Sequence, residues 1–227
     1  MGFTVKLRKW AAVVLLCAAT AGAVDNAHIK VLVSNSAGVG DSVLIHAEMA
    51  AARVFEGAGV DIDWSNCGSA FEPDACGQVL GPDEYMVHLV PNGITRTNSV
   101  FGEAFLGEDG TGKYCDVFFN RIESSEREFG TTAVALLGNV MAHELGHLLL
   151  GSHAHSMTGI MQPTWDSESM RNIGMGSLFF TSQQSKLMRA RVAKQMLVVS
   201  SRTIRFASQR PATGAAGTVL IRQGFLP

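Results

Sequence analysis

Residues 131–150 read TTAVALLGNVMAHELGHLLL, a long apolar stretch with few polar interruptions. After the two threonines, the only polar side chains are Asn139, His143, Glu144 and His147. A threonine can cap the start of a helix, and Gly151 can end it in a left-handed turn. The length would also suit a membrane span, but three titratable residues on adjacent turns predict a buried core helix instead.

His143, Glu144 and His147 form an HExxH pattern. Residues four apart project from the same face of a helix, so the two imidazoles can bind one metal ion. Zinc suits imidazole nitrogen, and a catalytic zinc keeps one coordination position open for water. Glu144 is expected beside that position as the general base that takes the proton of the water. Burying these side chains without a metal would cost on the order of several kcal/mol.

A tetrahedral site needs a third protein ligand. His153 and His155 follow the helix at once, and either can approach the metal. Glu168 is a more distant alternative, since a carboxylate can replace the third imidazole. Residues 156–163 read SMTGIMQP, which predicts a tight turn that contains Met161.

These residues resemble the metzincin clan of zinc peptidases, and its matrixin-like members most. The family pattern is HExxHxxGxxH, followed by a methionine-containing turn beneath the metal. Here the glycine position of the pattern holds Leu150, and Gly151 comes one residue late. Strict spacing therefore selects His153 as the third ligand. A longer helix with a wider turn selects His155, which the later glycine favours and which is followed by serine, as in matrixins.

The resemblance covers about residues 28–195 and implies an α/β (α+β), zincin-like fold. Such a fold has a twisted mixed sheet, an active-site helix, a Met-turn and a C-terminal helix. It also implies a secreted zinc-dependent endopeptidase whose edge strand, with Gly102 and Ala104, pairs with an extended protein or peptide substrate. A structural Ca²⁺ at residues 108–110 is a weaker expectation. The alternative is a zinc-holding binding or inhibitory module without turnover, which would have no need for Glu144.

The rest of the sequence fits a sheet covered by helices. Hydrophobic periodicity predicts strands at 29–33, 60–64, 85–90, 101–106 and 114–122, and helices at 42–55, 131–150 and 180–194. The buried stripe of the first helix is assigned to Leu44, Ile45, Met49, Ala52 and Phe55. No internal repeat is visible, so we expect one catalytic domain at 24–199 and a basic, loosely ordered extension at 200–227.

Residues 1–23 have the pattern of a signal peptide. Three cationic residues precede an apolar run at 10–19, and Ala21-Gly22-Ala23 suits signal cleavage. The mature protein is then secreted or periplasmic and carries no membrane span. Its net charge, −2 for the whole chain, excludes a typical nucleic-acid binder. We expect a monomer.

Export permits disulfides, and signal cleavage removes Cys17. Cys67 and Cys76 flank a loop rich in Gly, Pro and Asp, which makes them the preferred pair. Cys115 then remains as a buried free thiol.

Overall fold

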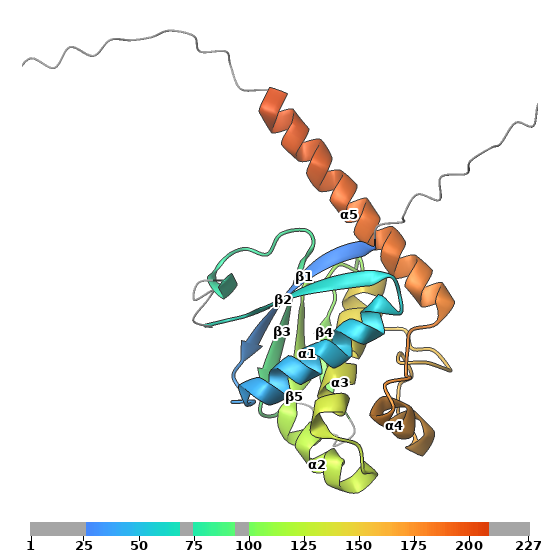
Figure 1. Ribbon diagram of the computed structural model, residues 1–227. Coiled ribbons are helices and arrows are strands. Elements are labelled where there is room, and N and C mark those ends of the chain that lie inside the picture. The colour runs from blue at the N-terminus through green and yellow to red at the C-terminus, as the bar shows by residue number, and fades with distance from the viewer. Residues whose placement is uncertain (1–25, 69–74, 94–99, 209–227) are drawn as a thin grey trace, which may run out of the picture.

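The computed structural model describes residues 26–68, 75–93 and 100–208 (Figure 1). The elements are β1 (Ala27–Asn35), α1 (Asp41–Glu56), β2 (Val60–Asn66), the 3₁₀ helix η1 (Ala75–Gly77), β3 (Glu84–Val90), β4 (Gly102–Phe105), β5 (Tyr114–Phe118), α2 (Phe119–Phe129), α3 (Ala133–Leu150), α4 (Ser167–Gly174) and α5 (Ser182–Ser208). The predicted signal peptide and residues 209–227 lie outside the described residues.

The five strands form one mixed sheet in the order β2-β1-β3-β5-β4. Strands β2, β1, β3 and β5 are parallel, and β4 runs antiparallel to β5 at the edge. Val31, Leu32 and Val33 on β1 are all buried, as expected for a strand covered on both faces. The sheet, the motif-bearing helix, the methionine turn and the C-terminal helix confirm the predicted fold class.

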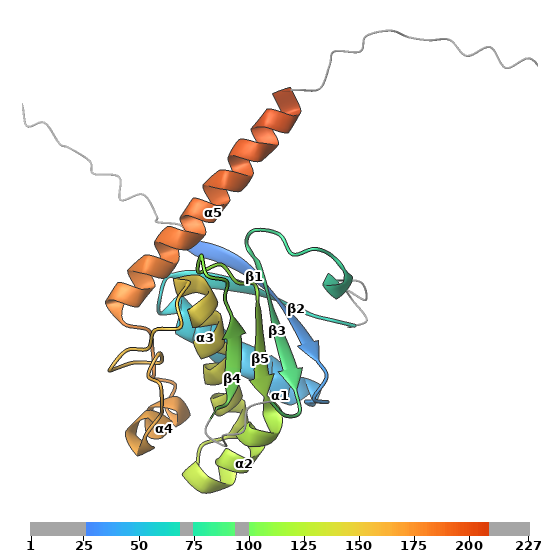
Figure 2. The same ribbon diagram turned by 180° about the vertical axis from the view of Figure 1, so that it is seen from behind.

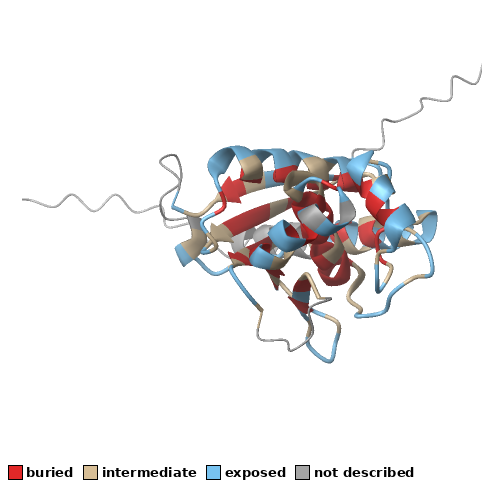
Figure 3. Ribbon diagram, turned by 90° about the horizontal axis from the view of Figure 1, so that it is seen from below, coloured by how far each residue is buried: buried red, intermediate tan, exposed pale blue. Residues whose placement is uncertain are grey.

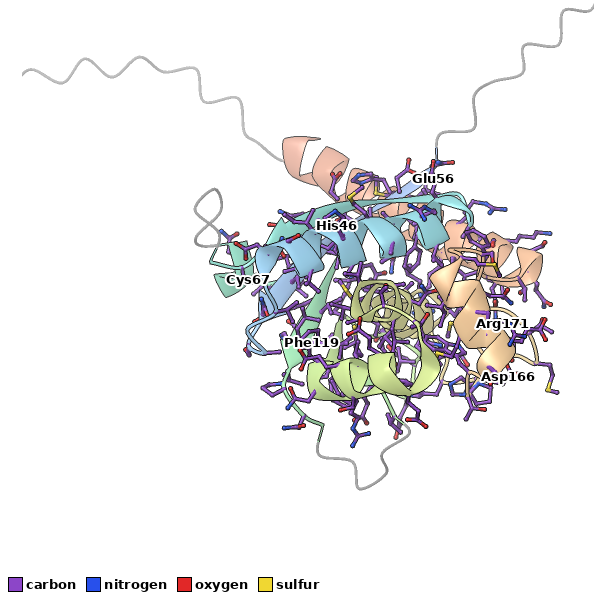
Figure 4. The ribbon with its side chains drawn as sticks, turned by 60° about the horizontal axis from the view of Figure 1, so that its bottom comes forward. His46, Glu56, Cys67, Phe119, Asp166 and Arg171 are labelled. Atoms are coloured by element: carbon purple, nitrogen blue, oxygen red, sulfur yellow. A yellow bond between two sulfur atoms is a disulfide. The ribbon has the colours of Figure 1, made fainter. Side chains whose placement is uncertain are left out.

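Helix α3 lies at the centre of the molecule. Figure 4 views the chain nearly along it, with α1 and its His46 on one side and α2, which begins at Phe119, on the other. Seen from below, most of α3 is buried (Figure 3). Its composition would suit a membrane span, but 72% of the helix is buried inside the protein. Its apolar side chains therefore pack inside the protein core, as predicted for a buried core helix.

The ends of α3 also agree with the sequence. The hydroxyl oxygen of Thr132 accepts a hydrogen bond from the backbone N–H of Ala135 at 3.2 Å, which caps the first turn. At the other end Gly151 adopts φ +66°, and its N–H donates to the carbonyl of His147. A residue with a Cβ would be strained in this conformation, so the glycine sets where the helix stops.

The buried stripe of α1 differs from the prediction. Ile45 and Met49 are 51% and 58% exposed, whereas the small residues Ala47 and Ala51 are fully buried. The reason is a close helix crossing. A Cβ on Gly138 of α3 would lie 2.5 Å from the carbonyl oxygen of Ala47, so only small side chains fit between the two helices. The hydrophobic periodicity had instead assigned the large residues Ile45 and Met49 to the buried face.

Three other element predictions need correction. The predicted strand 114–122 ends at Phe118 and continues as α2, because a short apolar run does not distinguish a strand from a helix. Helix α4 was not predicted. Helix α5 begins after Thr181, whose hydroxyl accepts from the N–H of Gln184, and whose own N–H donates to the Gln184 side chain. It continues to Ser208, past the predicted helix end at 194, and projects beyond the body of the protein (Figures 1 and 2).

The cysteine predictions are confirmed. Cys67 and Cys76 form a disulfide that closes the loop after β2. Cys115 is a free, buried thiol on β5.

The crossing of α1 and α3 gives a first prediction. Glycine to alanine in a helix interior normally raises stability by up to about 1 kcal/mol, but Gly138→Ala should lower it by roughly 1–3 kcal/mol because the new methyl meets Ala47 and Ala50. Urea denaturation measures the change. Ala135→Gly in the same helix is the control, since it should show the ordinary cost of glycine. A Gly138→Ala variant as stable as the parent would contradict the close crossing.

Candidate metal centre

Two histidines of α3 face each other across a very short gap. The Nε2 atoms of His143 and His147 are 3.2 Å apart, and the two rings meet edge to face. His147 is buried and His143 is partly buried. The spacing of four residues brings them together, as the helical pattern requires.

Backbone carbonyls orient both rings. The Nδ1 of His143 lies 2.8 Å from the carbonyl oxygen of Ile160, and the Nδ1 of His147 lies 2.8 Å from that of Ser152. A carbonyl can only accept, so each Nδ1 carries the proton and donates it. Each Nε2 then presents a lone pair to the gap between the rings. This is the tautomer and the orientation that a metal-binding histidine needs.

His155 completes the group. One ligand atom each from His143, His147 and His155 lies within 4.8 Å of the others. Among the described residues this is the only close group of three or more His, Cys, Asp or Glu side chains. His153 is exposed and its ring centre is 6.0 Å from that of His147, outside the group. Glu168 is exposed in the first turn of α4 and is likewise not a member.

The donor set fits a zinc ion. Two imidazole nitrogens on a tetrahedral zinc, with bonds of about 2.0–2.1 Å, are about 3.3 Å apart. The observed separation of 3.2 Å is close to this value. Two facing lone pairs at that distance repel unless a cation lies between them. A proton is a poor substitute, because burial lowers the pKa of His143 to about 4 and also lowers the pKa of His147.

Glu144 lies beside the histidines in an unusual environment. Only 6% of its surface is exposed. Burial, and next the charge of Glu103, raise its pKa to about 8 in the metal-free protein. The space it occupies is left by a glycine on the edge strand: a Cβ on Gly102 would lie 2.7 Å from the Glu144 Cγ and 2.8 Å from its Oε1. Gly102 therefore gives the carboxyl group room at the metal centre.

The methionine turn packs directly beneath α3. Met161 is fully buried, and its carbonyl accepts from the N–H of Ser156 at 2.8 Å. A Cβ on Gly146 would lie 2.7 Å from the Met161 sulfur, so the glycine inside the motif lets the turn approach. The same turn supplies the Ile160 carbonyl that orients His143. Gly146 and this carbonyl were not among the predicted site residues.

A cavity of about 720 Å³ opens over the group. Its walls come from the edge strand, α2, α3 and the segment after the methionine turn, and they include Gly102, Ala104, Glu128, His153 and Trp165. Trp165 stacks on Phe101 with ring centres 6.4 Å apart, contacts His143 edge-on, and donates its indole N–H to the Ile160 carbonyl. Trp165 was not among the predicted site residues, although a lone tryptophan in the polar stretch after the turn could have indicated it.

The acidic turn 108–110 is held by hydrogen bonds within the chain. One oxygen of Asp109 accepts hydrogen bonds from both the N–H and the hydroxyl of Thr111, at 2.9 and 2.7 Å. Asp109 thus closes a local turn, and the calcium site stays a prediction.

The described residues form an α/β fold with a cluster of three histidines that can hold a metal ion, a neighbouring carboxyl group and an open cavity. No family model matches the chain, and no curated protein matches it in sequence. Among solved structures, it is similar to an archaemetzincin from Methanopyrus kandleri, with 17% identity, a TM-score of 0.48, and coverage of 74% of this chain and 97% of that one. The interpretation of the site depends on its own side chains.

The matrixin-like part of the predicted resemblance is not supported. The histidine that joins His143 and His147 is His155, the candidate favoured from the sequence, and it lies two residues later than the strict HExxHxxGxxH spacing, which would select His153. The physical reason is the end of α3. Leu150 continues the helix, and the chain turns only at Gly151.

The environment of Glu144 gives a second prediction, for chelator-treated protein. The folded state keeps the carboxyl protonated up to about pH 8, whereas the unfolded chain ionises it from about 4.5. Stability is therefore lost as pH rises between these values, by up to about 1.4 kcal/mol for each pH unit. Glu144→Gln removes this loss, so the stability of the variant relative to the parent should increase between pH 5 and pH 8.

Thermal unfolding of both proteins at the two pH values measures the difference. Added zinc should reduce the difference in stability between the variant and the parent, because a neighbouring cation stabilises the ionised Glu144 of the parent. A gap that does not change with pH would contradict the buried placement of Glu144.

Proposed function

We propose that the protein is a zinc-dependent peptidase of the metzincin type, an endopeptidase that hydrolyses peptide bonds. His143, His147 and His155 hold the zinc ion, and Glu144 is the general base. The observation that carries the proposal is the pair of Nε2 lone pairs 3.2 Å apart, each fixed by a backbone carbonyl, beside a buried carboxyl group in an open cavity. The matrixin subdivision is not part of the proposal.

A zinc ion held by these three histidines would lower the pKa of a bound water and polarise the scissile carbonyl. Glu144 would act as the general base and then as the general acid, taking a proton from the attacking water and giving it to the leaving amine. A carboxyl group suits this double role when its pKa lies near the working pH. Burial raises the pKa of Glu144 in the metal-free protein, and a neighbouring cation would lower it.

The substrate is an extended peptide that binds along β4. This strand is at the edge of the sheet, and residues 100–104 line the cavity beside the histidines. A peptide added to such an edge gains backbone hydrogen bonds and passes close to the metal. Gly102 lies against Glu144, so the peptide bond to be cut would lie beside β4 near this residue.

Export from the cytoplasm is part of the proposal. The Cys67–Cys76 disulfide supports it, because such bonds persist in oxidising compartments. The signal-like residues 1–23 support it independently. A secreted or periplasmic monomer that degrades protein or peptide fits both features.

Loss of the base should separate metal binding from turnover. Glu144→Gln is expected to bind one zinc per chain, as the parent does, while cleavage of an unfolded protein such as casein falls at least about a thousandfold. Metal analysis and a labelled-casein assay measure the two properties. Zinc binding by both proteins with no cleavage by either would favour a zinc-holding module without turnover, and cleavage retained in Glu144→Gln would disprove the role of Glu144.

The two histidines after the helix should differ. His155→Ala removes a proposed ligand and should weaken zinc binding by a factor of about a hundred or more, whereas His153→Ala should change it less than about threefold. Competition with a fluorescent chelator gives both affinities under the same conditions. Equal effects, or a larger loss in His153→Ala, would overturn the ligand set.

A further inference from the structure

Helix α5 reaches the end of the metal-bearing helix through one side chain. The Arg191 guanidinium donates a hydrogen bond to the carbonyl of Gly110 at 2.6 Å. The same group lies against Gly151, where an added Cβ would be only 1.8 Å from the Arg191 Nη1. Arg191 therefore contacts two separate turns, the loop after β4 and the turn that ends α3.

These two turns touch each other as well. An added Cβ on Gly110 would lie 2.5 Å from the carbonyl oxygen of Gly151, and both glycines have positive φ, at +71° and +66°. Two backbones approach this closely only because neither residue carries a side chain. The cationic guanidinium lies at the C-terminal end of α3, where a positive charge is favourable, and it donates to the Gly110 carbonyl.

The next residue along the chain orients a proposed metal ligand. Ser152 follows Gly151, and its carbonyl accepts from the Nδ1 of His147 at 2.8 Å. A rotation of the Gly151 turn would move this carbonyl away from the Nδ1 of His147. Partners of this kind fix the tautomer and direction of a ligating histidine, and their loss usually costs metal affinity by a factor of ten to a hundred.

We propose that Arg191 is a positioning residue for the metal centre: by holding Gly110 against Gly151, it sets the Ser152 carbonyl that orients His147. The inference rests on the proposed zinc site but not on peptide cleavage. In this proposal α5 helps to orient a metal ligand through Arg191, whereas its buried residues Met188 and Val192 only pack against the core.

The chain offers a matched control on the same helix. The Arg189 guanidinium donates to the carbonyl of Ala58 and lies against Gly59, another glycine with positive φ, at +72°. Its target is the turn between α1 and β2, which contributes no residue to the cavity or to the histidine group. Arg189 and Arg191 thus dock α5 in the same way, and only Arg191 docks it near a ligand.

The experiment compares full-length Arg191→Gln and Arg189→Gln. Both should lower the melting temperature of the metal-free protein by a similar amount. Zinc affinity, measured by chelator competition, should fall at least about tenfold in Arg191→Gln and change less than about twofold in Arg189→Gln. Arg191→Lys keeps the charge but not the planar guanidinium, so its zinc affinity should lie between those of the two glutamine variants. It replaces Arg191→Gln in the comparison if that variant does not fold.

Nitrogen NMR of the histidine rings gives a second readout without metal. The parent and Arg189→Gln should show His147 as the single Nδ1–H tautomer, and Arg191→Gln as a mixture of tautomers. Equal zinc affinities in the two glutamine variants, with an unmixed tautomer in both, would overturn the inference and leave Arg191 a packing residue. A parent that binds no zinc would instead refute the proposed function, while the tautomer measurement still tests Arg191.

Discussion

The site depends on two hydrogen bonds from imidazole to backbone. Without the carbonyls of Ile160 and Ser152, the rings of His143 and His147 could rotate or change tautomer, and their Nε2 atoms would not share one point. With them, two lone pairs meet at 3.2 Å in a partly buried place. Such an arrangement is costly for the protein alone and favourable only with a cation. The chemistry is therefore set by main-chain atoms as much as by the histidines.

Both carbonyls come from turns that glycines make possible. Ser152 follows the left-handed Gly151, which stops α3 one turn after His147. Ile160 precedes Met161, whose sulfur occupies the space left by Gly146 on α3. The methionine turn is also held by the segment that precedes α5, since the N–H of Ile160 donates to the Phe179 carbonyl. One helix, two turns and the start of the C-terminal segment thus fix the geometry of the pair.

Much of this could be predicted from the sequence where the signal was local. The ends of α3 followed from the two threonines at 131–132, of which Thr132 is the cap, and from Gly151. The pairing of Cys67 with Cys76 followed from their loop, and the resemblance placed β4 at the sheet edge. The face of α1 was wrong because burial there depends on how near α3 comes, which periodicity does not contain. Helix α2 was missed because its start continues the apolar run of β5.

The third histidine shows where local reasoning ends. Spacing alone allowed His153 or His155, and the lateness of Gly151 favoured the second. The Ser152 carbonyl already accepts from His147, so the backbone leaves the helix end at a fixed direction. Two residues then lie between Ser152 and His155, the histidine that joins the group. A shift of one residue in the helix end thus changes which side chain completes the site, and hydrogen bonds near the end determine ligand identity more directly than the motif does.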